Sequence, residues 1–125
     1  VAYYNDSKGT NIDAVMRAVE AMKGPVLLIA GGVSKGCSFF SWIEKFSGKV
    51  KRICAIGEAA PCLKNELGKF IDVEVFEDLP SAVKSASTTA KQGDVVLLSP
   101  GCASFDMFKN YEHRGDEFKR IVNAL

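Results

Sequence analysis

The stretch 26-VLLIAGGVSKG-36 decides the fold, because a fully apolar run from Val26 to Ala30 passes directly into a glycine-rich turn. An apolar run without alternation is typical of a strand that is buried on both faces of a sheet. Similar short, β-rich runs occur at residues 1–4, 51–56, 71–76 and 95–98. Helical patterns separate them, at residues 10–22, 38–46, 59–67, 79–91 and 105–125. This alternation predicts an α/β, Rossmann-like fold, with a mostly parallel sheet and helices on both faces.

The composition indicates a single folded domain over residues 1–125. With 47% hydrophobic and 25% charged residues, the chain is neither collagen-like, nor disordered, nor a disulfide scaffold. Its 16 Lys and Arg against 15 Asp and Glu leave a formal net charge of +1. No field of the whole molecule would therefore attract nucleic acid or an acidic membrane, and we expect neither as a partner. Any anion site must be local.

The cysteines predict a reduced protein without a metal site. They include no C-x-x-C pair and no histidine at zinc spacing, and free cysteines usually behave as small buried hydrophobes. The four are Cys37, Cys54, Cys62 and Cys102. The first residues lack the features of a signal peptide, and no apolar run approaches the length that spans a membrane. We therefore expect a cytoplasmic location, and the absence of an initial Met leads us to expect a longer protein.

Unusual sequences follow three of the expected strands. In parallel α/β sheets, ligands bind beyond the carboxyl ends of the strands. The segments at these ends are 5-NDSKGT-10, 31-GGVSKG-36 and 99-SPGCAS-104. Because the strands are expected to be parallel, all three segments should open on the same edge of the sheet.

The segment after the second strand matches a phosphate-binding loop only in part. Gly31 and Gly36 have the glycine spacing of a P-loop, but that motif needs a lysine where Cys37 stands. A glycine-rich turn before a helix still offers free N–H groups to an anion, and Lys35 adds a positive charge. The alternative is a tight turn in which Lys35 is solvated.

The first segment combines a carboxylate, an amine and hydroxyl groups. One interpretation is an ordinary helix start, with Asn5 or Thr10 as the cap and Lys8 in solvent; Thr10 and Asp13 have the spacing of a capping box. The other is a nucleotide site, in which Asp6 binds the hydroxyls of a ribose and Lys8 neutralises phosphate. The spacing leaves both open.

The third segment predicts a helix that begins at Phe105 and is interrupted at Arg114-Gly115. Ser104 would either cap this helix or bind a carboxylate. His113, the single histidine, lies in a charged run and is expected in solvent, so no histidine-based catalytic arrangement is assembled. Aromatic residues three apart follow, a spacing more common in a core stripe than in a ligand pocket: Phe105, Phe108 and Tyr111.

Two motifs resemble the bacterial peptidoglycan Mur ligases, in particular those that add D-glutamate. The segment 5-NDSKGTN-11 is similar to the family motif N-D-S-K-A/G-T-N, and 99-SPGCASFDMFKNYEHRGDEF-118 is similar to S-P-A-C-A-S-x-D-x-F-x-N-F/Y-E-x-R-G-x-x-F. The resemblance covers essentially all 125 residues. It extends only to the C-terminal, amino-acid-binding domain of such an enzyme, without the N-terminal domain and the ATP-binding central domain.

This resemblance implies part of an ATP-dependent amide-bond ligase that adds D-glutamate to UDP-N-acetylmuramoyl-L-alanine in peptidoglycan biosynthesis. ATP and Mg²⁺ would serve the full-length enzyme, while this domain alone would bind neither and would be inactive. By the family pattern, Asp6 would contact the ribose, and Lys8 would lie near the phosphates as a catalytic residue. Lys35 and Ser104 would clasp the carboxylates of D-glutamate. The full set expected to hold D-glutamate is Thr10, Lys35, Ser104, Phe105 and Tyr111.

Two alternatives stay open. The chain is the C-terminal domain of another Mur or folylpolyglutamate-type ligase, which shares the strand and helix framework but takes another substrate. Alternatively, it is a free-standing α/β module that binds an anion or a nucleotide. The length of the full reading frame separates the second alternative from the ligase interpretation.

Overall fold

The computed structural model describes residues 1–33, 38–102 and 108–125. Within these ranges the strands are β1 (Ala2–Asn5), β2 (Val26–Gly31), β3 (Val50–Ile56), β4 (Val73–Val75) and β5 (Val95–Leu98). The helices are α1 (Ile12–Ala21), α2 (Ser41–Phe46), α3 (Ala60–Leu67), α4 (Leu79–Thr89) and α5 (Tyr111–Asn123). The strands pair in parallel in the order β1-β5-β2-β3-β4. This confirms the predicted α/β, Rossmann-like fold.

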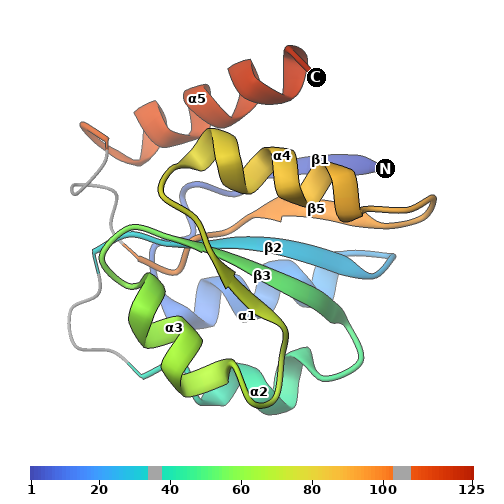
Figure 1. Cartoon of the computed structure of the whole chain (residues 1–125), viewed down its shortest axis with the longest axis vertical. Coiled ribbons are helices and arrows are strands. Elements are labelled where there is room, and N and C mark those ends of the chain that lie inside the picture. The colour runs from blue at the N-terminus through green and yellow to red at the C-terminus, as the bar shows by residue number, and fades with distance from the viewer. Residues whose placement is uncertain (34–37, 103–107) are drawn as a thin grey trace.

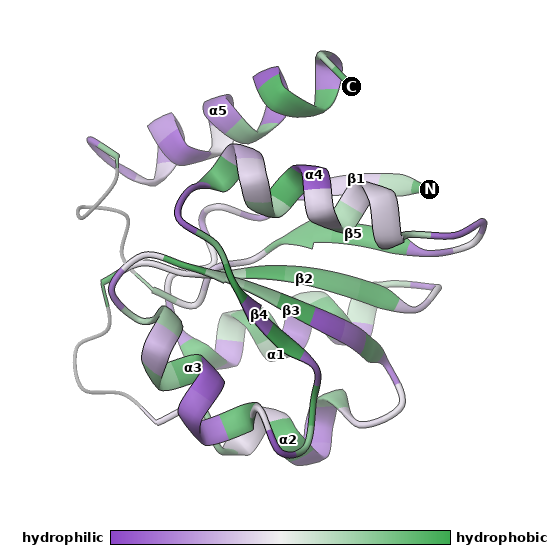
Figure 2. Ribbon diagram, in the orientation of Figure 1, coloured by the Kyte–Doolittle hydropathy of each residue, from purple (hydrophilic) through white to green (hydrophobic). Residues whose placement is uncertain are grey.

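Helices cover both faces of the sheet, with α1, α2 and α3 on one face and α4 and α5 on the other (Figure 1). The strand β2 lies in the middle, and all its residues are buried. Because successive side chains of a strand point to opposite faces, Val26 and Leu28 pack with the first group of helices. Leu27 and Ile29 pack with the second group. Figure 2 shows the resulting apolar centre of the sheet. Because β2 is buried on both faces, residues 26–31 include no polar side chain.

A buried tryptophan joins α2 to the rest of the core. The ring of Trp42 lies 5.1 Å from the ring of Phe39 and 5.1 Å from that of Phe46. Its indole N–H donates a hydrogen bond of 3.2 Å to the carbonyl of Ile12, at the start of α1. The Trp42 ring therefore packs against other aromatic rings, and its buried N–H group has a hydrogen-bond partner. The helix α2 begins later than predicted, at Ser41.

The start of α1 corrects the predicted cap. Asn11, rather than Thr10, is the N-cap, because its side-chain oxygen accepts a hydrogen bond of 2.9 Å from the N–H of Ala14. Asp13 lies in the first helical turn, where the helix dipole stabilises a negative charge. The helix therefore starts at Ile12, one residue later than a cap at Thr10 would place it.

The last helix also differs from its prediction. It begins at Tyr111, where Asn110 is the N-cap and accepts a hydrogen bond of 2.7 Å from the N–H of His113. It continues through Arg114 and Gly115, so the predicted interruption there is wrong. The predicted helix start at Phe105 lies outside the described residues.

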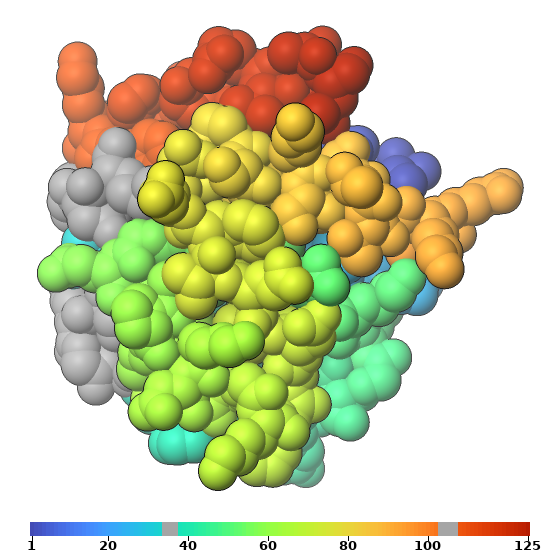
Figure 3. All heavy atoms as spheres, viewed as in Figure 1, coloured from blue at the N-terminus to red at the C-terminus, as the bar shows by residue number. Residues whose placement is uncertain are grey.

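The carboxyl ends of the strands meet at one edge of the sheet, on the left in Figure 1, while the N-terminus lies on the opposite side. In the space-filling view, α3 and α4 cover much of the visible face and α5 lies along its upper margin (Figure 3). Among the described residues, no helix is both long enough and apolar enough to cross a membrane.

Candidate functional site

The segments after β1, β2 and β5 meet because these strands are neighbours in the sheet. The N–H of Asp6 donates to the carbonyl of Leu98 at 2.7 Å, which extends the pairing of β1 with β5 beyond the strands. The N–H of Gly101 donates to the carbonyl of Gly9 at 2.8 Å. The N–H of Gly31 donates to the carbonyl of Pro100 at 3.0 Å. For the described residues of these segments, 5–10, 31–33 and 99–102, the prediction that they lie at one edge of the sheet is confirmed.

Asp6 is held in place by a hydroxyl from the neighbouring segment. The hydroxyl of Ser99 donates a hydrogen bond of 2.8 Å to Oδ2 of Asp6. Gly9 passes close by, and a Cβ at that position would lie 2.6 Å from the same oxygen. Asp6 is half-buried, whereas Ser99 is fully buried. The carboxylate is therefore oriented by the protein and still reaches solvent.

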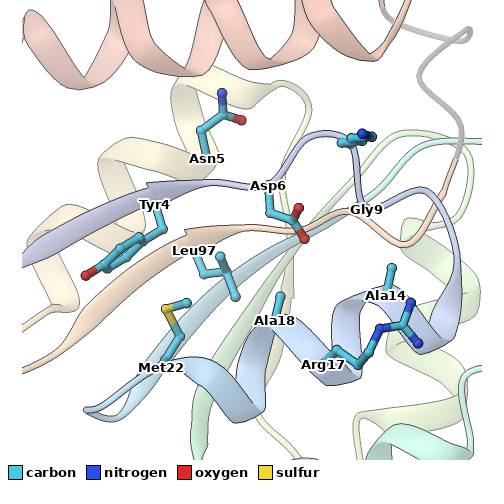
Figure 4. A pocket seen from close by; sticks show the side chains of 10 residues that line it. Tyr4, Asn5, Asp6, Gly9, Ala14, Arg17, Ala18, Met22 and Leu97 are labelled. Atoms are coloured by element: carbon cyan, nitrogen blue, oxygen red, sulfur yellow. The ribbon is translucent and has the colours of Figure 1, made fainter.

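A hollow of about 560 Å³ lies beside this carboxylate. Figure 4 shows the side chains that line it, between β1 and α1. The side chain of Asp6 points into it, while that of Asn5 points the other way, toward α5. Arg17 rises from α1 at its margin, where the small side chains of Ala14 and Ala18 leave room. The hollow thus has an apolar floor with charges of both signs at its rim. Sequence reasoning missed Arg17, since a single charge on a helix carries no signal.

Lys8 and Thr10 are both exposed. Lys8 lines the hollow next to Asp6 and also a second hollow of about 250 Å³ between the first segment and α5. An exposed amine at the junction of two hollows is free to meet an anion from solvent. Thr10 directly follows Gly9, whose carbonyl accepts the hydrogen bond from Gly101, so it lies where the first and third segments join.

The start of α5 lies against the first segment. The carbonyl of Tyr111 accepts a hydrogen bond of 2.6 Å from the hydroxyl of Ser7. The side chain of Tyr111 is 38% exposed and lines the 250 Å³ hollow together with Lys8. Of the predicted site residues, the structure therefore places Lys8 beside Asp6 in the first hollow and beside Tyr111 in the second, whereas Thr10 lines neither of these two hollows.

Arg114 joins α5 to two of the segments, and sequence reasoning missed it. Its side chain is 1% exposed. Nε donates to the hydroxyl of Ser7 at 2.9 Å, and Nη2 donates to the carbonyl of Ser7 at 2.7 Å. Nη1 donates to the carbonyl of Cys102 at 3.0 Å. The signal was the spacing of Arg114 and Phe118, which places the arginine on the apolar stripe of the helix.

Gly115 lets α5 approach this closely. A Cβ at Gly115 would lie 2.9 Å from Nδ2 of Asn5 and 3.2 Å from Cβ of Ser7. The Asn5 side chain in turn accepts a hydrogen bond of 3.1 Å from the N–H of Ser7. Arg114-Gly115, interpreted from sequence as a break in the helix, is instead the contact between the helix and the first segment.

The remaining predicted residues, Lys35, Ser104 and Phe105, lie outside the described residues. The chain on either side of residues 34–37 is held by the β3–α3 region. The carbonyl of Gly32 accepts a hydrogen bond of 2.9 Å from the N–H of Ala59. Oε1 of Glu66 accepts one of 2.7 Å from the N–H of Phe39. The predicted clasp of D-glutamate by Lys35 and Ser104 stays a prediction.

Cys54 is buried and Cys62 is half-buried, and both are thiols. Burial raises the pKa of the Cys54 thiol to about 12. A hydrogen bond to Glu66 raises the pKa of the Cys62 thiol. Both shifts favour the neutral thiol, which is a poor nucleophile and metal ligand. No cluster of potential metal ligands occurs in the described part of the chain.

His113 is not simply a solvated residue, so that prediction is corrected. It is half-buried, and its Nδ1 accepts a hydrogen bond of 3.1 Å from the N–H of Lys109. Its ring lies edge-on to that of Phe108, with 5.4 Å between the centroids. Both contacts tie the first turn of α5 to the residues that precede the helix.

Comparisons with known proteins agree with this geometry. The sequence matches the family described as Mur ligase, glutamate ligase domain, over residues 1–102. It is 58% identical over 125 residues to the UDP-N-acetylmuramoylalanine–D-glutamate ligase of Protochlamydia amoebophila, covering 100% of this chain and 28% of that protein. Ligases of the same name from Thermoanaerobacter sp. and Coxiella burnetii are 47% identical over 129 residues. The chain spans 28% and 29% of their lengths.

A solved structure supports the fold independently. The folylpolyglutamate synthase from Thermotoga maritima is similar with a TM-score of 0.51 at 20% sequence identity. The similarity covers 72% of this chain and 23% of the synthase chain. At this identity the likeness bears on the fold alone, and it agrees with a Rossmann-like domain.

Proposed function

Because this chain belongs to the Mur ligase family, as its glutamate ligase domain, we propose that it is the C-terminal domain of an ATP-dependent ligase of peptidoglycan biosynthesis. The complete enzyme joins D-glutamate to UDP-N-acetylmuramoyl-L-alanine through an amide bond. Residues 1–125 supply the amino-acid-binding domain, and the remainder of the protein supplies the other substrate sites. The enzyme acts in the cytoplasm.

One observation carries this proposal. The two segments whose sequences resemble the family motifs are joined at the carboxyl edge of the sheet, where the N–H of Gly101 donates to the carbonyl of Gly9. The glycine-rich segment joins them there, because the N–H of Gly31 donates to the carbonyl of Pro100. Ligands of parallel α/β sheets bind at that edge. The identity of 58% to a D-glutamate ligase extends over the whole chain, and so includes all of these segments.

The nucleotide would meet the first segment. A carboxylate binds the vicinal hydroxyls of a ribose, and Asp6 is suited to this because Ser99 fixes its orientation next to an open hollow. Lys8 is an exposed point charge on the same hollow, which suits a phosphate. These residues fit ATP, which would bind together with Mg²⁺ in the full-length enzyme.

ATP supplies the phosphoryl group that activates the carboxylate of UDP-N-acetylmuramoyl-L-alanine. The amine of D-glutamate would then attack the activated carbonyl carbon: the C–N bond would form, the C–O bond to phosphate would break, and the nitrogen would lose a proton to solvent. Lys8 contributes by stabilising negative charge that develops on the transferred phosphate. Apart from Lys8, this chain would act by binding and orienting ATP and D-glutamate.

D-Glutamate would bind where the three segments converge. It carries two carboxylates, so its site needs two separated groups that hold anions. Lys35 with Thr10 provides one, and Ser104 provides the other. Phe105 and Tyr111 would form the wall of the pocket, for which the exposed ring of Tyr111 beside Lys8 offers support.

These contacts are too few for tight binding by the domain alone. A hydrogen bond to a charged group contributes about 1.5–3 kcal/mol. Two or three partly solvated bonds give a net binding free energy of roughly 4 kcal/mol, which corresponds to a dissociation constant of about 1 mM. The isolated domain should therefore bind D-glutamate weakly and catalyse no ligation.

The test is a ligation assay with the full-length protein, ATP, Mg²⁺ and UDP-N-acetylmuramoyl-L-alanine. We expect phosphate release and product formation with D-glutamate. L-Glutamate, L-lysine, diaminopimelate and D-alanyl-D-alanine serve as matched amino substrates. Preference for one of these would assign the chain to another ligase, and a reading frame that encodes only this domain would support the free-standing module.

A further inference from the structure

Burial of a guanidinium group costs free energy unless its N–H groups are hydrogen-bonded. Arg114 is 1% exposed, and within the described residues its side chain donates to acceptors that lie outside its own helix. They are the hydroxyl and the carbonyl of Ser7, and the carbonyl of Cys102. These three hydrogen bonds stabilise the buried charge, and they form when the chain after β1 and the chain after β5 both lie against α5.

The planar fork of arginine makes this arrangement geometrically strict. Nε and Nη2 bind two atoms of the same residue, Ser7, at 2.9 Å and 2.7 Å. Nη1 binds the carbonyl of Cys102 at 3.0 Å. A lysine keeps the charge, but it cannot reproduce donors in a fixed plane that point to two segments at once.

Ser7 carries the contact one step further. Its hydroxyl accepts from Nε of Arg114 and donates to the carbonyl of Tyr111 at 2.6 Å. Ser7 lies between Asp6 and Lys8, which the proposed function assigns to the nucleotide. Tyr111 is assigned to D-glutamate. Ser7 is 4% exposed, and its buried hydroxyl thus connects the segment that carries Asp6 and Lys8 to the backbone of Tyr111.

We propose that Arg114, acting through Ser7, is a positioning residue that sets the nucleotide-binding and the amino-acid-binding groups in one fixed relationship. This inference rests on the proposed function of the chain. Arg114 touches neither ligand in this account. Its removal should therefore displace Lys8 and Tyr111 together, although they lie on different segments.

The experiment uses the full-length ligase with Arg114→Met, which keeps the length of the side chain but removes every donor. We expect the KM values for ATP and for D-glutamate both to rise about tenfold, as expected for loss of a hydrogen bond to a charged group. The KM for UDP-N-acetylmuramoyl-L-alanine should change less than about twofold. Arg114→Lys should show the same two increases, because it lacks the fork.

The matched control is Arg120→Met on the same helix. Arg120 is exposed and pairs with Glu117, at 2.8 Å between Nε and Oε2. This variant should leave all KM values unchanged. If Arg114→Met lowers only the melting temperature or kcat, with KM values like those of Arg120→Met, or raises the KM of one substrate alone, the inference is wrong.

A second variant covers loss of folding. If Arg114→Met does not fold, Ser7→Ala is measured instead, and the same paired increase in both KM values is required. Amide hydrogen exchange provides a readout that does not depend on the reaction. Residues 5–9 and 108–112 should both exchange faster in Arg114→Met than in Arg120→Met, even if the wild-type protein proves to ligate no D-glutamate. Unchanged exchange in either segment would refute the positioning role, whereas an inactive wild type would refute only the proposed function.

Discussion

The hydroxyl of Ser99 lies 2.8 Å from Oδ2 of Asp6, so the first residues after β5 and β1 are joined side chain to side chain. Ser99 has no exposed surface. A buried hydroxyl whose partner is a carboxylate is oriented by that partner, and it orients the carboxylate in return. The proposed ribose contact therefore depends on a residue from another strand.

Ser99→Ala should raise the KM of the full-length ligase for ATP severalfold and leave that for D-glutamate nearly unchanged. Loss of the bond should also lower the free energy of unfolding by about 1 kcal/mol. Ser87→Ala is the control, because Ser87 also loses one hydrogen bond, of 3.1 Å to the hydroxyl of Tyr3, but lies on α4. Equal KM values for ATP in the two variants would contradict the role of Ser99.

Lys8→Gln should lower kcat/KM for ATP by about tenfold to a hundredfold, since it removes a positive charge from the phosphates. The steady-state rate as a function of ATP concentration measures this. Lys23→Gln removes an equally exposed lysine from the turn before β2, beside a hollow at the other end of β1. If both variants retain the wild-type rate, Lys8 does not act on the phosphates of ATP.

Gly31→Ala should destabilise the protein by about 3 kcal/mol or more, measured by chemical denaturation. A Cβ at Gly31 would lie 1.9 Å from the backbone carbonyl oxygen of Ile56, and the φ angle is +130°. Gly48 also has a positive φ, +77°, but nothing lies within 4 Å of its Cβ position. Gly48→Ala should therefore cost only about 1–2 kcal/mol, from backbone strain alone. Similar losses in both variants would mean that the contact with β3 is unimportant.

Stability should fall as the pH rises between 9 and 12, in part because of Cys54. Burial raises the pKa of its thiol from 9.0 to about 12, so across this window the folded protein keeps a proton that the unfolded chain releases. The unfolded state binds fewer protons there, and the free energy of unfolding decreases with pH. Denaturation at neutral pH and midway through the window should show a smaller loss for Cys54→Val than for wild type. Parallel losses would exclude this thiol as a cause.

The sequence was sufficient to predict the positions of the strands that are buried on both faces of the sheet. Residues 26–30 contain no polar side chain, and β2 follows this run closely because helices cover both of its faces. Helix starts were less well predicted. Thr10 and Asn11 are adjacent and both suit an N-cap, and only the bond from Ala14 to Asn11 distinguishes them.

The candidate site was predictable where its residues lie in one short motif, as Asp6 and Lys8 do. Arg114 was missed because it stands among charged residues, which hides the one local signal, its spacing to Phe118 on the apolar stripe of α5. The packing against Ser7 shows why it is buried. The same packing explains Gly115, which sequence reasoning took for a helix break. Contacts between segments far apart along the chain leave no local pattern from which they can be predicted.

The most direct test of the central claim is the kinetics of Lys35→Ala in the full-length ligase, with KM measured separately for D-glutamate and for ATP. The account predicts that the KM for D-glutamate rises about tenfold or more, as for the loss of one charged hydrogen bond, while that for ATP changes far less. Equal increases for both substrates, or no increase for D-glutamate, would contradict it.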